Sequence, residues 1–231
     1  MTAGVRLSDA DLAARSSAFE DLAASGAGPE EVALAVLSWG VEAFGDALCV
    51  TSSMTDAVMV DLATRVDPSV EVVFVDTDYH FDETWETVHH VLRRYRPALR
   101  IVGSGLPADD LWRTDPDACC ARRKVAPLER VLAGREAWAT GLRRADGATR
   151  AATPYVARDR RGLVKLAPLA AWSDADVQGY VLRRDVPVNP LVEQGYPSVG
   201  CWPCTRRPVD GDPRSGRWAG TGKVECGLHF P

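Results

Sequence analysis

Apolar residues recur along the chain with two different periods. Between 8 and 24 they fall about three to four residues apart, after a polar Ser8-Asp9 pair, which predicts a capped helix. A second helical run begins at Pro29, a residue favoured in the first turn of a helix. By contrast, 47–53 and 70–78 are short, β-branched and mostly apolar, as is typical of strands covered on both faces.

Strands and helices then alternate through most of the chain. The sequence from Ser173 to Asp176 resembles a capping box at the start of a helix. Strands are predicted at 47–53, 70–78, 99–103 and 136–142, and helices at 56–66, 81–95, 120–133 and 173–183, with 163–169 leading into the last helix. This alternation predicts an α/β fold with an open, doubly wound, mostly parallel sheet.

Two polar loops follow predicted strands. Ser52 and Ser53 open a helix after the first strand, and Asp76 and Thr77 end the second strand. Open α/β sheets bind ligands beyond the carboxyl ends of their strands, and a helix N-terminus attracts phosphate. The first loop lacks glycine and is not a Walker motif, so by itself it indicates a phosphate site only weakly.

The composition narrows the class of protein. A length of 231 residues fits one domain, or one domain with an appendage, and 46% hydrophobic residues are ordinary for a globular protein. No apolar run reaches the roughly 18 residues of a membrane span. The N-terminus also lacks the basic start and apolar core of a secretory signal. We therefore expect a cytoplasmic protein, in which paired disulfides are not the default.

The charge pattern indicates the kind of ligand. A net charge of −5 disfavours a nucleic-acid surface. Basic residues nevertheless cluster in the second half, for example at 122–124, 143–144 and 206–207. A single cluster of this kind is typical of solvated surface, but together they favour a small, multiply anionic ligand over a polymer.

Four of the six cysteines occur in two pairs. Cys201 and Cys204 form a CxxC, which can share a metal or act as a redox pair. The adjacent Cys119 and Cys120 cannot readily form an unstrained disulfide, because neighbouring Cα atoms are closer than the usual disulfide separation. Four thiolates fit either zinc or an iron–sulfur cluster, and the spacing does not choose between them.

The other two cysteines differ in their surroundings. Cys49 lies inside a predicted strand and is interpreted as a buried, inert thiol. From Asn189 onward the chain is rich in glycine and proline, which predicts an irregular segment. Cys226 lies in this segment without a near partner. It is either an exposed thiol or a nucleophile that a mobile segment delivers, with more thiolate near lysine or arginine.

Several motifs resemble those of the adenylylsulfate reductases of bacterial sulfate assimilation, in the PAPS/APS reductase family. They are CCxxRKVxPL (119–128), GCxPCTRRPVxGDxRSGRW (200–218) and KxECGLH (223–229), with VDTDYHFDET (75–84) and PLAAWSDADV (168–177) similar to two further motifs. The resemblance covers roughly residues 45–231 in consistent order.

The resemblance implies a reaction and its cofactor. It implies a [4Fe–4S] cluster on Cys119, Cys120, Cys201 and Cys204, and Cys226 as the nucleophile that attacks the sulfur of adenosine 5′-phosphosulfate. Thioredoxin or a similar dithiol protein would then release sulfite, as a step of sulfate assimilation and cysteine biosynthesis. The family also implies an adenine-nucleotide-binding sheet and association into a homo-oligomer. On this basis 1–204 forms the nucleotide-binding domain with the iron–sulfur site, and 205–231 a mobile segment carrying the nucleophile.

Attack by a thiolate on an anionic sulfonyl group requires preplaced cations. The candidate substrate-binding residues are Ser52, Ser53, Asp76, Thr77, Lys124, Arg143, Arg144, Arg150, Arg214, Arg217 and His229. His80, His89 and His90 are expected on a helix face instead, and Trp202 and Trp218 are expected to pack.

The chain departs from the family pattern in two loops. Its phosphate loop has no glycine, and Asp78 stands where the family usually has glycine.

The resemblance also bears on the substrate. In this family the presence of both cysteine pairs favours the substrate without a 3′-phosphate, although a minority of cluster-bearing relatives accept both forms. Three alternatives stay open: a reductase of the 3′-phosphorylated compound or of both, an ATP-pyrophosphatase-type nucleotidyl transferase, which would need a glycine-rich loop, and a non-catalytic zinc module that binds nucleotide.

Overall fold

The computed structural model describes residues 7–209 and 213–228, and six strands form its sheet in the order β3-β2-β1-β4-β6-β5. The parallel strands are β1 (Leu48–Thr51), β2 (Glu71–Asp76), β3 (Ala98–Gly103), β4 (Ala137–Thr140) and β6 (Val164–Leu166). β5 (Val156–Arg158) pairs antiparallel with β6 at one edge. The predicted α/β class with an open, mostly parallel sheet is therefore confirmed.

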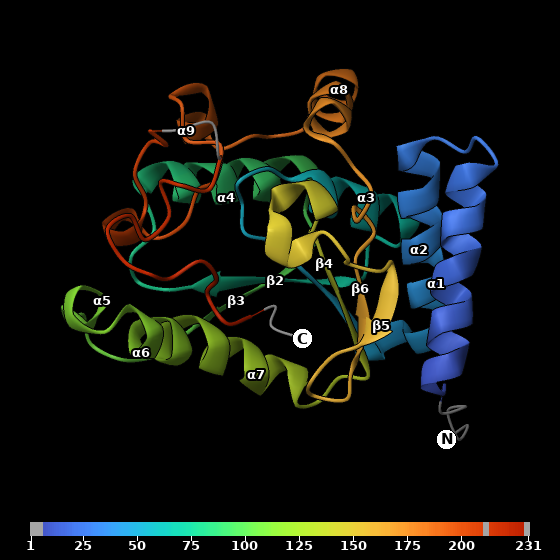
Figure 1. Ribbon diagram of the computed structural model, residues 1–231, viewed down its shortest axis with the longest axis horizontal. Helices are drawn as coiled ribbons and strands as arrows, with labels where there is room; N and C mark the ends of the chain where they lie inside the picture. The colour runs from blue at the N-terminus through green and yellow to red at the C-terminus, as the bar shows by residue number, and fades with distance from the viewer. Residues whose placement is uncertain (1–6, 210–212, 229–231) are drawn as a thin grey trace.

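Helices cover both faces of the sheet (Figure 1). On one face, α2 (Pro29–Phe44) packs against α3 (Val58–Val66), which in turn contacts α4 (Asp82–Tyr95) and α8 (Asp174–Arg184). On the other face, α7 (Ala126–Leu132) lies against β3. Beside the sheet, α1 (Asp9–Ala24) packs against α2 and the edge strand β5.

Alternate residues of the central strands build two separate cores. Val50 and Val72 belong to the core beneath α2 and α3. Cys49 and Val73 point the other way, into a smaller core that also contains Trp138. Because a strand sends successive side chains to opposite faces, a sheet covered on both sides needs this nearly continuous apolar sequence. Cys49 is fully buried, which confirms its interpretation as a core thiol.

Three helix starts agree with their sequence signals. Ser8 caps α1 and Ser173 caps α8, each in a capping box with the aspartate three residues later. Pro29 occupies the first turn of α2, where its missing N–H costs no hydrogen bond. These positions show that local backbone chemistry fixes where the helices begin.

The predicted helix at 120–133 is wrong in one respect, because it is interrupted. α6 (Pro116–Cys120) ends at the second cysteine, a π-helical turn spans Ala121–Val125, and only then does α7 begin. Pro127 cannot donate a backbone hydrogen bond, so the regular helical ladder cannot continue unbroken through it. Further short elements that the pattern did not predict are β5, α5 (Leu111–Thr114), α9 (Pro190–Glu193) and 3₁₀ turns at 45–47, 144–146, 148–150 and 202–204.

The part of the C-terminal segment that the structure describes is irregular, as expected. Its Thr205 and Arg217 form an isolated antiparallel bridge. The segment then folds over the face that carries α7 and buries Trp218, Cys226 and Leu228 there. The division at 204 and the mobility of the segment stay predictions. None of the described helices is long and apolar enough to cross a membrane.

Candidate active site

Five of the six cysteines line one small cavity at the carboxyl-end edge of β2: Cys119, Cys120, Cys201, Cys204 and Cys226. The first two come from α6, the next two from a 3₁₀ turn, and the last from the C-terminal segment. Thr77, immediately after β2, Lys124, in the π-helical turn, and Arg217, in the C-terminal segment, add polar groups to the lining. These groups are spread along the sequence between Thr77 and Cys226, and the fold brings them together.

Local hydrogen bonds hold both cysteine pairs in place. Asp115 caps α6 by accepting a hydrogen bond from the backbone N–H of Ala118 at 2.9 Å. The Oγ1 atom of Thr77 lies 3.2 Å from the sulfur of Cys201. The backbone N–H of Trp218 donates to the carbonyl of Cys204 at 2.9 Å, which ties the C-terminal segment to the same turn.

Burial favours the neutral forms of Cys119, Cys120 and Cys204. Burial, followed by the charges of the neighbouring thiols, raises the pKa of Cys119 to about 12. Burial likewise raises the pKa of Cys120 to about 11, and it raises the pKa of Cys204. Thiolates are the metal-binding form, so a bound cation would offset this penalty. Among residues 7–209 and 213–228, however, no three or more His, Cys, Asp or Glu side chains form a ready-made site for a metal ion.

Cys226 has the opposite electrostatic environment. Burial alone would raise the pKa of its thiol, but the Lys124 ammonium, the backbone N–H of Leu228 and the Arg217 guanidinium outweigh it and hold this pKa below the ordinary value. Its residue surface is 7% exposed. Among the cysteines around the cavity, Cys226 is thus the one whose thiolate is favoured, as a nucleophile requires.

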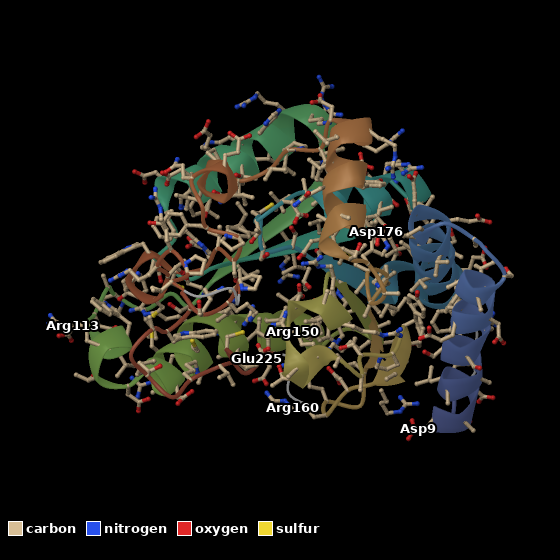
Figure 2. All side chains as sticks on the ribbon, turned by 45° about the horizontal axis from the view of Figure 1, so that its top comes forward. Asp9, Arg113, Arg150, Arg160, Asp176 and Glu225 are labelled. Carbon is tan, nitrogen blue, oxygen red and sulfur yellow. The ribbon has the colours of Figure 1, made fainter. Side chains whose placement is uncertain are left out.

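The residue before Cys226 takes part in a buried ion pair. Arg150 donates from Nε and Nη2 to the two carboxylate oxygens of Glu225, at 2.8 and 2.9 Å. Arg150 also pairs with Asp146 at 3.0 Å, and Asp146 pairs with Arg143 at 2.8 Å. Figure 2 shows Arg150 and Glu225 facing one another from the 3₁₀ turns and the C-terminal segment.

The predicted cations divide into two groups. Arg217 lines the cysteine cavity, and Arg150 and Arg214 both reach Glu225. Arg144 instead turns toward α1, where it pairs with Glu20 and lies over the ring of Tyr155. Since α1 covers the far edge of the sheet, Arg144 does not join the other cations. His229 lies outside the described residues.

The predicted residues of the two polar loops also fall into two groups, according to whether they line the cysteine cavity. Thr77 lines the cavity, whereas the carboxylate of Asp76 accepts the backbone N–H of Asp78 at 2.9 Å and so shapes its own turn. Ser52 accepts the backbone N–H of Met54 at 3.3 Å, and Ser53 is exposed at the carboxyl end of β1. These three residues lie at the carboxyl ends of β1 and β2 and are not part of the lining of the cysteine cavity.

The side chain of Asp78 is exposed to solvent and also pairs with Arg123, but it does not line the cysteine cavity. It adopts a left-handed backbone with φ of 66°, a conformation that glycine adopts with less strain than other residues. Its carboxylate accepts a hydrogen bond from Arg123 at 2.7 Å. Arg123 is 2% exposed, pairs also with Asp109 at 3.0 Å and lies 4.8 Å from the centre of the Tyr79 ring.

Sequence reasoning missed Arg123 and Glu225 as organising residues. Both stand inside the family-like motifs, Arg123 directly before Lys124 and Glu225 directly before Cys226. Their position beside reactive groups was the one feature of the sequence that indicated a role. Their partners, Asp78 and Arg150, lie 45 and 75 residues away, which no local pattern connects to them.

Two expectations for ring side chains are wrong. His80 precedes α4, where its Nε2 bonds the carbonyl of Val75 at 2.9 Å, and burial lowers its pKa. His89 and His90 are indeed exposed on α4. Trp218 packs as expected, but Trp202 is 45% exposed, because it only edges against Trp112 and Tyr79 beside the cavity.

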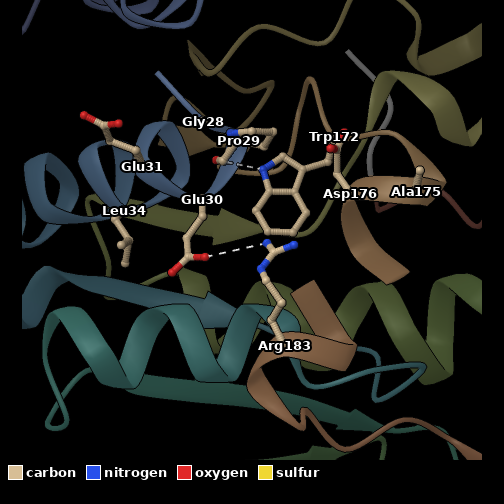
Figure 3. Close-up of a pocket in the computed structure, with 9 residues that line it drawn as sticks. All are labelled: Gly28, Pro29, Glu30, Glu31, Leu34, Trp172, Ala175, Asp176 and Arg183. Carbon is tan, nitrogen blue, oxygen red and sulfur yellow. Dashed lines mark hydrogen bonds and ion pairs between the residues drawn. The ribbon is translucent and has the colours of Figure 1, made fainter. Parts of the chain in front are cut away.

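A larger cleft lies elsewhere and has unsuitable chemistry. It measures about 530 Å³ between the first turns of α2 and α8 and is shown in Figure 3. Glu30, Glu31 and Asp176 line it, and Trp172 donates from its ring to the carbonyl of Pro29 at 3.0 Å. Its three carboxylates outnumber the one arginine in the lining, Arg183, and so oppose a polyanionic ligand. Since the cleft also contains no cysteine, volume alone does not identify the active site.

Known proteins resemble this chain in sequence and in structure. The phosphoadenosine phosphosulfate reductase domain matches residues 47–207. The adenosine 5′-phosphosulfate reductase of Streptomyces coelicolor is 52% identical over 213 residues, covering 87% of this chain and 89% of that protein.

Two solved structures resemble the fold. The phosphoadenylyl-sulfate (PAPS) reductase from Candida auris, as a phosphate complex, has a TM-score of 0.73 and 28% identity, covering 88% of this chain and 100% of that one. The FMN adenylyltransferase of Candida glabrata, with FAD and pyrophosphate bound, has a TM-score of 0.57 at 14% identity, over 86% of this chain and 76% of that one. The latter similarity concerns the fold alone.

Proposed function

Since the chain belongs to the phosphoadenosine phosphosulfate reductase family, we propose that it is an oxidoreductase of sulfate assimilation that reduces adenosine 5′-phosphosulfate to sulfite and AMP. The observation that carries this proposal is the position of Cys226, a buried thiol with a lowered pKa beside Lys124 and Arg217. A favoured thiolate among cations is the arrangement that attack on an anionic sulfur requires.

The chemistry proceeds in two exchanges at sulfur. The Cys226 thiolate attacks the substrate sulfur, the bond from sulfur to the phosphate oxygen breaks, and AMP leaves with that electron pair. The product is an S-sulfocysteine on the enzyme. A thiolate of thioredoxin or a similar dithiol protein then attacks the Cys226 sulfur and expels sulfite, and its second thiol resolves the mixed disulfide. The dithiol thus supplies both electrons.

The cations of the site have separate tasks. Lys124 and Arg217 lie close enough to Cys226 to lower its pKa, so they stabilise the thiolate and, during attack, the sulfonyl oxygens near it. Ser52, Ser53 and Asp76 stand at the carboxyl ends of β1 and β2, where the nucleotide of an open α/β sheet binds. Arg143 supports this edge indirectly, through its pair with Asp146.

The two cysteine pairs would hold a [4Fe–4S] cluster. Four thiols line one cavity, and burial raises the pKa of Cys119, Cys120 and Cys204, a penalty that bound iron would offset, so these residues suit the ligands of a multinuclear centre. A bound cluster would join α6 to the 202–204 turn and add a local charge beside Lys124. Zinc remains the competing occupant of four thiolates, and iron content with the visible spectrum separates the two.

The covalent intermediate gives the decisive test. Intact mass of the purified protein, mixed with adenosine 5′-phosphosulfate and no reductant, is expected to rise by one sulfonate group. The adduct should disappear on adding thioredoxin as sulfite is released, and Cys226→Ser should form none. A cluster-loaded protein that forms no adduct with this nucleotide or its 3′-phosphorylated form would refute the proposed reaction.

The 3′-phosphorylated compound is the second candidate substrate. The names of the matching domain and of the Candida auris structure favour it. The curated relative from Streptomyces coelicolor, at higher identity, favours the unphosphorylated form. Steady-state rates on the two nucleotides decide between them. Cytoplasmic location, thioredoxin as the reductant and a homo-oligomeric state belong to the same proposal.

A further inference from the structure

The carboxylate of Glu225 is enclosed by donors. Its residue surface is 7% exposed, and Arg150 binds both of its oxygens through two N–H groups, at 2.8 and 2.9 Å. Thr149 donates its hydroxyl to the same carboxylate at 3.1 Å, and Arg214 approaches at 3.5 Å. Paired hydrogen bonds from a guanidinium fix both the position and the orientation of a carboxylate.

The arginine is itself held in place from behind. Arg150 is 12% exposed at its side chain and donates to Asp146 at 3.0 Å. Asp146 in turn pairs with Arg143, which reaches Asp174 in the first turn of α8 at 2.9 Å. Alternating charges therefore run from the C-terminal segment to a helix on the opposite side of the ligand-binding edge.

Glu225 also lies where the C-terminal segment, buried earlier at Trp218, re-enters the protein after an exposed stretch. Residues 219–222 are exposed and Val224 is 65% exposed, whereas Glu225 and Cys226 are buried. One covalent peptide link joins the pinned carboxylate residue to the nucleophile. The ion pair with Arg150 is thus placed to set where the Cys226 sulfur lies.

We propose that Glu225 is a positioning residue: its ion pair with Arg150 latches the C-terminal segment and holds Cys226 in the cavity. The catalytic role given to this ion pair rests on the proposed function. The latch must open when the dithiol protein attacks the Cys226 sulfur and releases sulfite, because a nucleophile that is 7% exposed is out of reach of a protein thiol. Glu225 then governs both the closing of the site and its release.

The latch predicts opposite effects on two reactions of Cys226. Glu225→Gln keeps the size of the side chain but removes its charge, so the segment opens more often. Alkylation of Cys226 by iodoacetamide, followed on its tryptic peptide without substrate, is expected to become at least about tenfold faster. Single-turnover formation of the S-sulfonate at saturating adenosine 5′-phosphosulfate is expected to slow by about tenfold to a hundredfold, since the sulfur is displaced.

The limiting alkylation rate at high pH is the quantity to compare. Loss of the Glu225 charge also changes the fraction of thiolate, which moves the midpoint of the pH profile but not its plateau. A higher plateau therefore reports opening of the segment. Glu225→Asp retains the charge but is one methylene shorter, so it should show a smaller effect of the same sign, and it substitutes for Glu225→Gln if that variant misfolds.

A double-mutant cycle with Arg150→Gln tests the pair itself. If the two residues act as one latch, the double variant should alkylate no faster than the Glu225→Gln single variant. Glu30→Gln is the matched control, because Glu30 pairs with Arg65 at 2.8 Å and lines the separate cleft of Figure 3. It should leave both rates unchanged.

The outcomes separate the latch from the proposed reaction. Equal alkylation plateaus in wild type and in both Glu225 variants, or additive effects in the cycle, would overturn the latch. Failure of wild type to form an S-sulfonate would refute the proposed function, while the alkylation results would still decide whether Glu225 holds the segment closed.

Discussion

The reactivity of Cys226 depends on a balance among a few neighbours. Burial raises the pKa of its thiol, while Lys124, the backbone N–H of Leu228 and Arg217 lower it further than burial raises it. Only the thiolate attacks, so the alkylation rate rises as pH increases through this pKa, and its midpoint should lie below that of an ordinary thiol.

Lys124→Met should move that midpoint upward, because it removes the cation that lowers the pKa of Cys226 most. At neutral pH the thiolate fraction, and with it the alkylation rate, should fall by about tenfold if the pKa rises by one unit. The rate at the high-pH plateau should stay near wild type. An unchanged midpoint would mean that Lys124 does not act on the thiol through its charge.

Individual residues also show which parts of the site a sequence can predict. The six cysteine assignments depended on motif and strand context, and the structure brings five of them to one cavity. Arg144 was grouped with Arg150 because the two share a loop, yet its partner Glu20 lies 124 residues away on α1. The role of Asp78 depended in the same way on Arg123, which no spacing rule links to it.

At the scale of elements, long periodic segments were predictable and short ones were not. α2 and α4 have clear apolar faces with a proline or acidic residues in the first turn. α2 begins at the predicted Pro29, and the bounds of α4 lie within one residue of the predicted 81–95. β5 has only three residues, which is too few to show an apolar periodicity in the sequence. It forms because it pairs with β6 and packs against α1. The π-helical turn after Cys120 arises within a run that otherwise reads as one helix.

The packing of α2 on the sheet depends on a glycine. A Cβ atom at Gly40 would lie 2.7 Å from a side-chain methyl of Leu166 and 3.3 Å from one of Leu48. Gly40→Val should therefore lower the free energy of unfolding by about 1–3 kcal/mol through overpacking. Urea unfolding followed by circular dichroism measures this change. Gly134→Val is the control, because a Cβ there meets nothing within 4 Å.

At the scale of the whole molecule, two kinds of order coexist. The sheet and its helices bury an apolar core on each face, in which many residues are fully inaccessible. The segment after α9 has no strand among its described residues beyond the isolated Thr205–Arg217 bridge, and its Cys201, Cys204 and Cys226 converge on the cavity. Bound iron at the four paired cysteines would thus stabilise mainly this segment and α6.

Loss of the metal centre should consequently unfold one part of the protein before the rest. In Cys201→Ser, we expect iron content to fall and amide hydrogen exchange in 199–209 and 213–228 to accelerate by about tenfold or more, while β1, β2 and β4 stay protected. Cys49→Ala should retain iron, because Cys49 belongs to the core of the sheet and not to the cavity. Uniform loss of protection across the sheet would instead show that the centre supports the entire fold. The C-terminal segment would then be part of a single cooperative unit, and the boundary at 204 would have no energetic meaning.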